Sequence, residues 1–323
     1  TTAFEGAGES FNDDAAIAKK LARDYGTKHT EILISKDVYL DNFIRSYERL
    51  EEPNYNISLP TYLEVARREG ASGDGNRVIL SGNGGDEVFG GYRYYAESVR
   101  YQYLMNRISS PLFNIGKWIR SGSYFDYASP VERWLAFKMF KLDGVHIDKQ
   151  RVSQYLKDIA SARSLRFGDP VRDMMLLDRA VWLTGESFMQ ADKLFMTHSL
   201  EVRAPLAYEP LRHYFDKRLT TKDYVSEGSN KALLRHTYKN LLPDYIIERK
   251  QKTGWRSPVR PWYAEDRRFK SLFVSILDGA KRGGMVKWDS LRTEVLARDT
   301  WPGKYMFLYL SLAILSKKYD VAL

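Results

Sequence analysis

Short strand patterns alternate with helix patterns along the first hundred residues, and this alternation restricts the folds open to the chain. Three segments are rich in branched or apolar residues over a few positions, as strands are: residues 1–4, 28–35 and 77–81. The segments between them carry apolar residues three or four positions apart, as helices with one buried face do: residues 13–26, 36–50 and 60–69. Strands alternating with helices predict an α/β fold with a parallel sheet, and residues 77–81 are apolar enough to lie inside it.

Helix patterns dominate the chain after Tyr92. Residues 130–140, 173–197 and 230–242 all carry helical spacing. The apolar run at residues 305–315 is too short to span a bilayer and predicts a buried helix. We therefore expect an α/β part over residues 1–100 and a mainly helical part over residues 101–323.

Composition narrows the class of protein. The chain has 323 residues and no cysteine, which excludes a disulfide framework, a cysteine nucleophile and a thiolate metal site, and fits a reducing cytoplasm. The net charge is +9, but the basic pairs are scattered, whereas a nucleic-acid footprint would cluster them, so we expect no nucleic-acid partner. No signal segment or membrane span is expected. The abrupt strand-like beginning, "TTAFEG", suggests a piece of a longer protein.

Residues 78–92, "VILSGNGGDEVFGGY", place glycines and acids directly after a strand. Loops at the carboxyl ends of parallel strands bind ligands, and glycines there let backbone N–H groups approach an anion. Ser81 adds a hydroxyl donor, while Asp86 and Glu87 are oxygen ligands suited to Mg²⁺. The segment lacks the lysine of a Walker loop and the spacing of a dinucleotide fingerprint. It predicts a site for a nucleotide with Mg²⁺; the structural alternative is a glycine-rich turn with a solvated acid pair.

Three ordered motifs carry a resemblance to a known family. They are "LSGNGGDEVFGGYRYY" (residues 80–95), "ADKLFMTHSLEVRAPL" (residues 191–206) and "NLLPDYIIERKQKTGWRSP" (residues 240–258). They are similar to segments of the C-terminal synthetase domain, of ATP-pyrophosphatase type, in the glutamine-hydrolysing asparagine synthetases. The resemblance runs from the first residue to about Tyr263, and loosely beyond.

The resemblance implies a fold, a reaction and partners. It implies a single synthetase domain over residues 1–323, with a parallel sheet of the ATP-pyrophosphatase (adenine nucleotide α-hydrolase-like) type followed by a mostly helical part. The implied enzyme is a carbon–nitrogen ligase that uses ATP and Mg²⁺. It converts aspartate to asparagine through β-aspartyl-AMP, with ammonia supplied from glutamine by an N-terminal glutaminase domain. The oligomeric state stays open, with a homodimer among the alternatives.

The resemblance also implies roles at the glycine loop. Ser81 and Gly82 match residues that contact ATP, and Thr2 matches a position that contacts adenine. Asp86 matches the acid associated with metal and pyrophosphate, and Glu87 lies beside it.

Roles outside the loop follow in the same way. Lys252 matches a lysine that contacts phosphate and stabilises the transition state of adenylation; alone it would read as a surface lysine. Lys193 and Arg203 are expected to support the substrate pocket, with a buried structural pair between Arg203 and Glu201 as the alternative. His198 is interpreted as a packing residue rather than a base.

Four departures from the family pattern qualify these expectations. The signature "SGGxDS" and the glutaminase cysteine are absent from the 323 residues, so we expect this chain to be inactive alone. Asn83 stands at a usually acidic catalytic position, and Tyr208 stands where an aspartate is usual. These two changes leave open a related ligase that adenylates another carboxylate, such as a β-lactam or macrocycle synthetase. A non-catalytic homologue is the third alternative.

Overall fold

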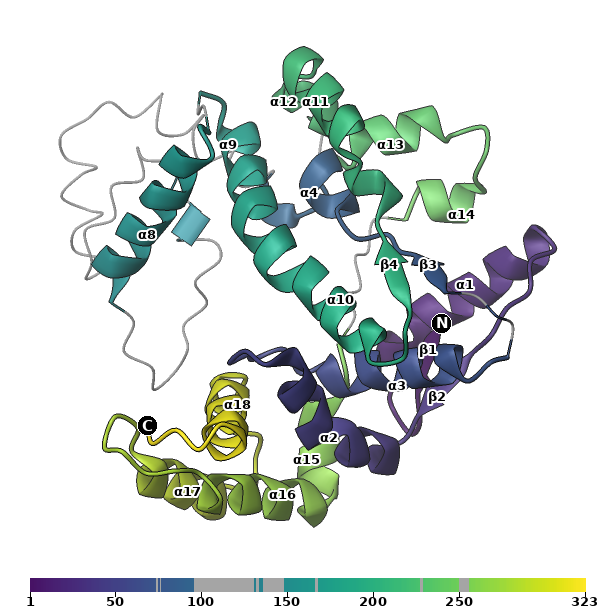
Figure 1. The fold of residues 1–323 in the computed structure, drawn as a ribbon. Helices are drawn as coiled ribbons and strands as arrows, with labels where there is room; N and C mark the ends of the chain where they lie inside the picture. The colour runs from purple at the N-terminus through teal and green to yellow at the C-terminus, as the bar shows by residue number, and fades with distance from the viewer. Residues whose placement is uncertain are drawn as a thin grey trace, which may run out of the picture.

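The computed structural model describes residues 1–73, 75, 77–95, 131, 134–135, 148–165, 168–226, 229–249 and 256–323. Strand β1 (Thr2–Phe4) pairs in parallel with β2 (Ile32–Ile34), and β3 (Val78–Leu80) pairs in parallel with β4 (Glu201–Arg203). A third pair, β5 (Val225–Ser226) with β6 (Ser229–Asn230), is antiparallel. Helices make up most of the described chain (Figure 1). The fold is α/β and largely helical, and its parallel pairs stay separate sheets within these residues.

The helices predicted near the amino end are confirmed. They are α1 (Glu9–Asp24), α2 (Lys36–Leu50) and α3 (Leu59–Gly70). The Ser35 hydroxyl caps α2 by accepting a 3.2 Å hydrogen bond from the Val38 N–H, and α2 ends where Glu51 adopts a left-handed conformation. These boundaries are set locally, by a side-chain cap at one end and a helix-terminating residue at the other.

One long helical segment runs from Pro170 to Met196 and confirms the helix pattern of residues 173–197. It consists of α9 (Pro170–Leu177), the π-helix η1 (Asp178–Phe188) and α10 (Met189–Met196), and α8 (Lys149–Ala162) precedes it. The other described helices are α4 (Gly85–Phe89), the 3₁₀ turn η2 (Pro205–Ala207), α11 (Glu209–Arg218), α12 (Thr221–Tyr224), α13 (Ala232–Thr237), α14 (Asp244–Ile247), α15 (Val259–Glu265), α16 (Arg267–Asp278), α17 (Trp288–Ala297) and α18 (Tyr305–Lys318). The predicted helix at 130–140 lies largely outside the described residues.

An aromatic core joins the two ends of the chain. Phe43 of α2, Phe273 of α16 and Phe307 of α18 are fully buried, and their ring centroids lie 5.4–5.6 Å apart. Aromatic rings at these separations attract one another beyond the effect of burial. Helix α18 is therefore the buried helix predicted from the apolar run. In the part of the chain that the structure describes, no helix has the length and apolar character needed to cross a membrane.

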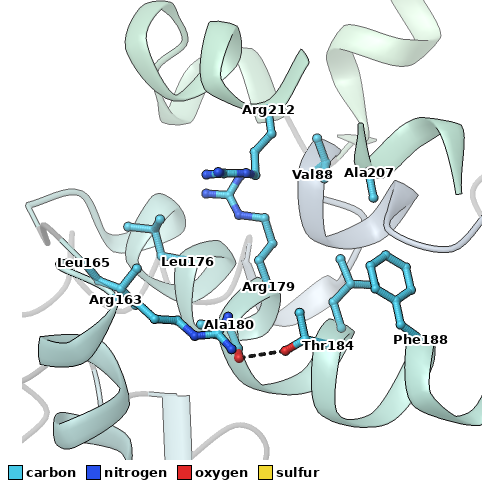
Figure 2. Close-up of a pocket in the computed structure, with 11 residues that line it drawn as sticks. Val88, Arg163, Leu165, Leu176, Arg179, Ala180, Thr184, Phe188, Ala207 and Arg212 are labelled. Atoms are coloured by element: carbon cyan, nitrogen blue, oxygen red, sulfur yellow. Dashed lines mark hydrogen bonds between the residues drawn. The ribbon is translucent and has the colours of Figure 1, made fainter. Parts of the chain in front are cut away.

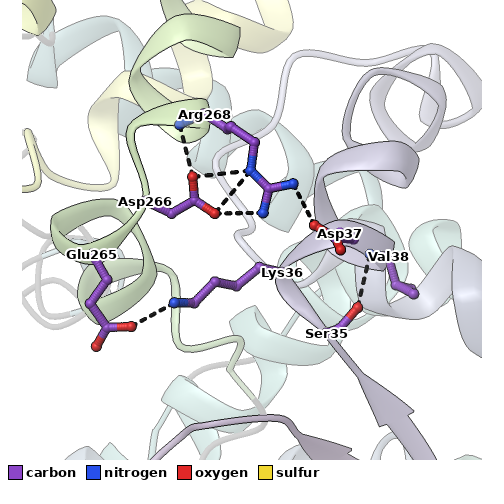
Figure 3. Close-up of polar contacts among 7 residues, drawn as sticks. All are labelled: Ser35, Lys36, Asp37, Val38, Glu265, Asp266 and Arg268. Atoms are coloured by element: carbon purple, nitrogen blue, oxygen red, sulfur yellow. Dashed lines mark hydrogen bonds and ion pairs between the residues drawn. The ribbon is translucent and has the colours of Figure 1, made fainter.

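Ion pairs at the surface hold the start of α2 against the start of α16 (Figure 3). Lys36 Nζ lies 2.6 Å from Glu265 Oε2, and Arg268 Nη1 lies 2.5 Å from Asp37 Oδ1. Arg268 also pairs with Asp266, which caps α16 by accepting a hydrogen bond from the Arg268 N–H. These contacts fix residues 36–37 against residues 265–268.

One expectation about the strands is wrong, and one strand was not predicted. Residues 78–80 do not lie inside a sheet, because Leu80 is 71% exposed and the strand has only β4 as a partner among the described residues. The sequence gives no strand signal at residues 201–203, yet β4 lies there. A three-residue strand is defined by its partner rather than by its own periodicity, so the pattern of residues 191–206 did not predict it.

Candidate functional site

Two of the sequence motifs meet at the carboxyl ends of β3 and β4. The Ser81 N–H donates a 2.8 Å hydrogen bond to the Arg203 carbonyl, and the Glu201 N–H donates one of 2.8 Å to the Arg77 carbonyl. The pairing register sets Leu80 opposite Arg203. The glycine loop that begins at Ser81 therefore leaves the sheet beside the second motif, at the edge where parallel strands present ligand-binding loops.

The loop takes a shape that needs glycine at one position above all. Gly84 has φ +84°, and a β-carbon built there would lie 2.6 Å from the Ala207 β-carbon. Both the left-handed backbone and the close approach exclude larger residues. Space is open instead at Gly82, where no atom would lie within 4 Å of a β-carbon. The Asn83 N–H donates a 3.4 Å hydrogen bond to Ser81 Oγ, so the loop is folded back on its own serine.

Asp86 has a cationic neighbour that the sequence patterns do not predict. Lys231 Nζ lies 3.0 Å from Asp86 Oδ1, and both side chains are partly exposed. Lys231 stands in the turn between β6 and α13 with φ +55°. A β-carbon at Gly91 would lie 1.8 Å from Asp86 Oδ1 and 2.4 Å from Lys231 Cε. The glycine thus gives the ion pair the room it occupies.

The two neighbouring acids have different environments. Glu87 is buried, with 3% of its surface exposed, and accepts a hydrogen bond from the Tyr92 hydroxyl. Burial raises the pKa of Glu87, against the effect of that hydrogen bond. The structure therefore separates the acid pair into a partly exposed Asp86 and an enclosed Glu87. A solvated acid pair, the structural alternative for this loop, does not describe it.

The other predicted site residues lie in three different places. Lys193, on α10, pairs with Glu51 at 3.4 Å, and Arg203 pairs with Glu201 at 2.9 Å. The pair of Arg203 is exposed, at 60% and 56% for the two side chains, so the alternative of a buried structural pair is wrong. Thr2 is half-buried and begins β1. The predicted role of Lys252 falls outside the described residues, and the catalytic roles of Asn83 and Glu87 stay predictions.

The donor set suits a metal shared with a nucleotide. In the described part of the chain, no three carboxylate or imidazole side chains converge on one point. Mg²⁺ in nucleotide sites keeps water and phosphate oxygens as ligands and takes only one or two carboxylates from the protein. The partly exposed Asp86 matches that requirement by itself, and ATP-Mg²⁺ would bring the remaining oxygens.

Comparisons with known proteins agree with the motifs. A protein from Mycobacterium tuberculosis named "Putative asparagine synthetase (glutamine-hydrolyzing)" is 29% identical over 285 residues, which cover 81% of this chain and 41% of that protein. Asparagine synthetase (glutamine-hydrolyzing) 1 from Bacillus subtilis is 25% identical over 265 residues, covering 76% of this chain and 40% of that protein. The chain thus spans about two fifths of the length of these relatives. A family model described as asparagine synthase matches residues 1–305. The chain belongs to the asparagine synthase family.

Proposed function

We propose that the protein containing this chain is an ATP-dependent ligase that converts aspartate to asparagine. The observation that carries the proposal is that two motifs meet at one edge of a sheet, where the Ser81 N–H donates a hydrogen bond to the Arg203 carbonyl. Asp86 follows Ser81 by five positions in the same loop. Family membership supports ATP as the cosubstrate and a ligase as the class of enzyme. Because the chain covers two fifths of its relatives, the whole reaction is a proposal.

The proposed reaction has two balanced steps. In the first, a side-chain carboxylate oxygen of aspartate attacks the α-phosphorus of ATP, the α–β phosphoanhydride bond breaks, and pyrophosphate leaves. In the second, ammonia attacks the acyl carbon of β-aspartyl-AMP, and AMP leaves with the electron pair of the C–O bond. The attacking nitrogen loses one proton and becomes the amide of asparagine. Glutamine, hydrolysed by a glutaminase domain of the same protein, is the proposed source of ammonia.

Different residues are proposed to contact different parts of ATP and its Mg²⁺. Ser81 and the open backbone at Gly82 would contact ATP, and Thr2 would contact adenine. Asp86 would hold Mg²⁺, which neutralises charge on the phosphates and on the departing pyrophosphate. The neighbouring Lys231 pairs with Asp86 in this structure. Its ammonium group would turn toward a phosphate oxygen when nucleotide binds.

Exchange of label between pyrophosphate and ATP tests the first step. The assay uses the longest natural protein that contains these residues, with and without aspartate. We expect aspartate to stimulate exchange, and Asp86→Asn to reduce it at least a hundredfold while the unfolding transition is retained. A rate of exchange that neither aspartate nor any other carboxylic acid increases would falsify the proposal of a ligase. The same assay on the 323-residue chain tests whether these residues suffice, and we expect no exchange from it.

A second candidate keeps the adenylation and changes the acid. Asn83 replaces a usually acidic residue within hydrogen-bond reach of Ser81, and Tyr208, which is 64% exposed, stands where an aspartate is usual. Both changes remove negative charge from the region of the site. A panel of carboxylates in the exchange assay decides between the candidates: stimulation by another acid, with none by aspartate, would replace asparagine synthesis by a related ligase reaction.

A further inference from the structure

A cavity of about 270 Å³ lies between the long helical segment and the elements that carry the loop (Figure 2). Helix η1 contributes Arg179, Ala180, Leu183, Thr184 and Phe188, while Val88 of α4 and Ala207 of η2 border it as well. None of residues 81–87 lines the cavity. It is therefore distinct from the proposed nucleotide site, although α4 borders both.

Arg179 is buried, and one arm of its guanidinium is without a partner among the described residues. The side chain is 8% exposed, and its Nη2 donates a 2.9 Å hydrogen bond to Asp216 Oδ1. Its Nη1 is buried and makes no hydrogen bond there. An unsatisfied buried donor on a cation is costly, so native proteins rarely keep one without a ligand, ion or water to accept from it.

Positive charge exceeds negative charge around the cavity. Arg212 and Arg163 line it together with Arg179, and Figure 2 shows the guanidinium groups of Arg179 and Arg212 close together. Both of these arginines share Asp216, since Arg212 Nη1 donates a 3.0 Å hydrogen bond to Asp216 Oδ2. One carboxylate thus balances two of the three guanidinium groups, and Glu209, which also pairs with Arg212, is mostly exposed.

The remaining walls are apolar and favour an organic ligand over a bare inorganic anion. They consist of Val88, Leu165, Leu176, Leu183 and Phe188. The hydroxyl of Thr184 is already engaged, because it donates a 2.9 Å hydrogen bond to the Ala180 carbonyl. Arginine meets carboxylates with parallel N–H donors, and apolar walls bury hydrocarbon.

The helix that carries Arg179 gives independent support. All 11 residues of η1 are π-helical, and π-helical turns are rare and occur frequently at functional sites. Five of the residues around the cavity come from this one element. The wide helix brings Arg179 and Thr184, five positions apart, to the same wall.

We propose that this cavity binds a small organic carboxylate with an apolar body. The carboxylate is held by the guanidinium groups that line the cavity, those of Arg179, Arg212 and Arg163, while the body contacts Leu176, Leu183 and the other apolar walls. The site goes beyond the proposed ligase reaction, because it needs neither nucleotide nor aspartate.

The test uses 4-bromobenzoate as the probe on the 323-residue chain. Calorimetry should detect its binding, and anomalous diffraction from a soaked crystal should place bromine in the cavity. Arg179→Gln should weaken binding at least tenfold, as loss of one charged hydrogen bond predicts. Arg218→Gln is the matched control, because Arg218 is an exposed arginine of α11 that does not line the cavity.

A second variant guards against loss of folding in the first. Thr184→Phe should fill the cavity and abolish binding without removing a charge, and circular dichroism checks that each variant is folded. Bromine located elsewhere, equal affinity in Arg179→Gln, or phosphate binding as tightly as 4-bromobenzoate would each overturn the proposal. The ligase proposal is untouched by any of these results, since the exchange assay does not involve the cavity.

Discussion

Lys231 Nζ and Asp86 Oδ1 lie 3.0 Å apart, although 145 positions separate the two residues in the sequence. The pair joins the turn before α13 to the glycine loop and neutralises Asp86, the partly exposed acid of the loop. Its position depends on Gly91, which leaves room for both side chains.

Gly91→Ala should disturb this pair. The new β-carbon would lie 1.8 Å from Asp86 Oδ1, so the carboxylate and Lys231 must move apart or the backbone must shift. We expect the free energy of unfolding to fall by about 1–3 kcal/mol, as overpacking of a filled site does. Urea unfolding measures it. Gly8→Ala is the control, since a β-carbon there has no neighbour within 4 Å, and an equal loss in both variants would contradict the explanation.

Asp178→Asn should destabilise the helical part. Asp178 is fully buried and accepts hydrogen bonds from the hydroxyls of Tyr94 and Tyr95 and from Trp134 Nε1 at 2.9 Å. An amide has one acceptor oxygen fewer and turns its NH₂ group toward a donor. We expect a loss of about 2–3 kcal/mol in the free energy of unfolding, the magnitude of hydrogen bonds to a buried charge.

The matched control for Asp178 is Asp158→Asn, which makes the same change on the exposed face of α8. It should shift the unfolding free energy by less than about 0.5 kcal/mol. Comparable losses of unfolding free energy in the two variants would contradict the explanation that the buried hydrogen bonds of Asp178 stabilise the fold.

Glu64 should make the free energy of unfolding depend on pH in the acid range. Its burial opposes ionisation, but hydrogen bonds from Arg67, Arg68 and Asn42 outweigh it and lower the pKa of Glu64 from 4.5 to about 2. A carboxyl whose pKa is lower in the folded state stabilises the fold above its unfolded pKa. That stability is lost as the pH falls from about 4.5 to about 2.

Glu64→Gln should therefore flatten the curve of unfolding free energy against pH in that window. The wild-type and variant curves should converge at the acid end, since both side chains are then neutral. Glu69→Gln, on the same helix, provides the control and should leave the slope unchanged. A persistent slope in Glu64→Gln would assign the pH dependence to other acids.

Arg203→Gln should separate stability from function. The ion pair of Arg203 with Glu201 is exposed, and exposed pairs contribute about 0–1 kcal/mol, so the thermal midpoint should hardly change. If Arg203 supports the substrate pocket, the aspartate concentration that half-saturates pyrophosphate exchange should rise at least tenfold. Unchanged aspartate dependence would leave Arg203 with a surface role alone.

The sequence predicted what local chemistry determines. Helix α2 has an apolar stripe that is visible in the spacing of residues 36–50, whereas its Ser35 cap was not predicted. The glycine loop was recognisable because glycines and acids directly follow a strand pattern in residues 78–92. Family resemblance then supplied roles for Ser81 and Asp86 that spacing alone does not give.

Contacts between distant segments were beyond the sequence patterns. Strand β4 forms because Glu201 and Arg203 pair with β3. The pattern of residues 201–203 alone does not predict a strand. Lys231 reaches Asp86 through a turn whose path depends on the rest of the fold. The unsatisfied Nη1 of Arg179 is likewise visible only when its surroundings are known.

The hydrogen bond from Ser81 to Arg203 has a consequence for the order of folding. The two residues are 122 positions apart, and pairing of such distant segments is slow because the intervening chain must first be ordered. During synthesis, the glycine loop would leave the ribosome long before the strand that supports it. We therefore expect added nucleotide to protect the glycine loop against proteolysis only in nascent chains that extend well past Arg203.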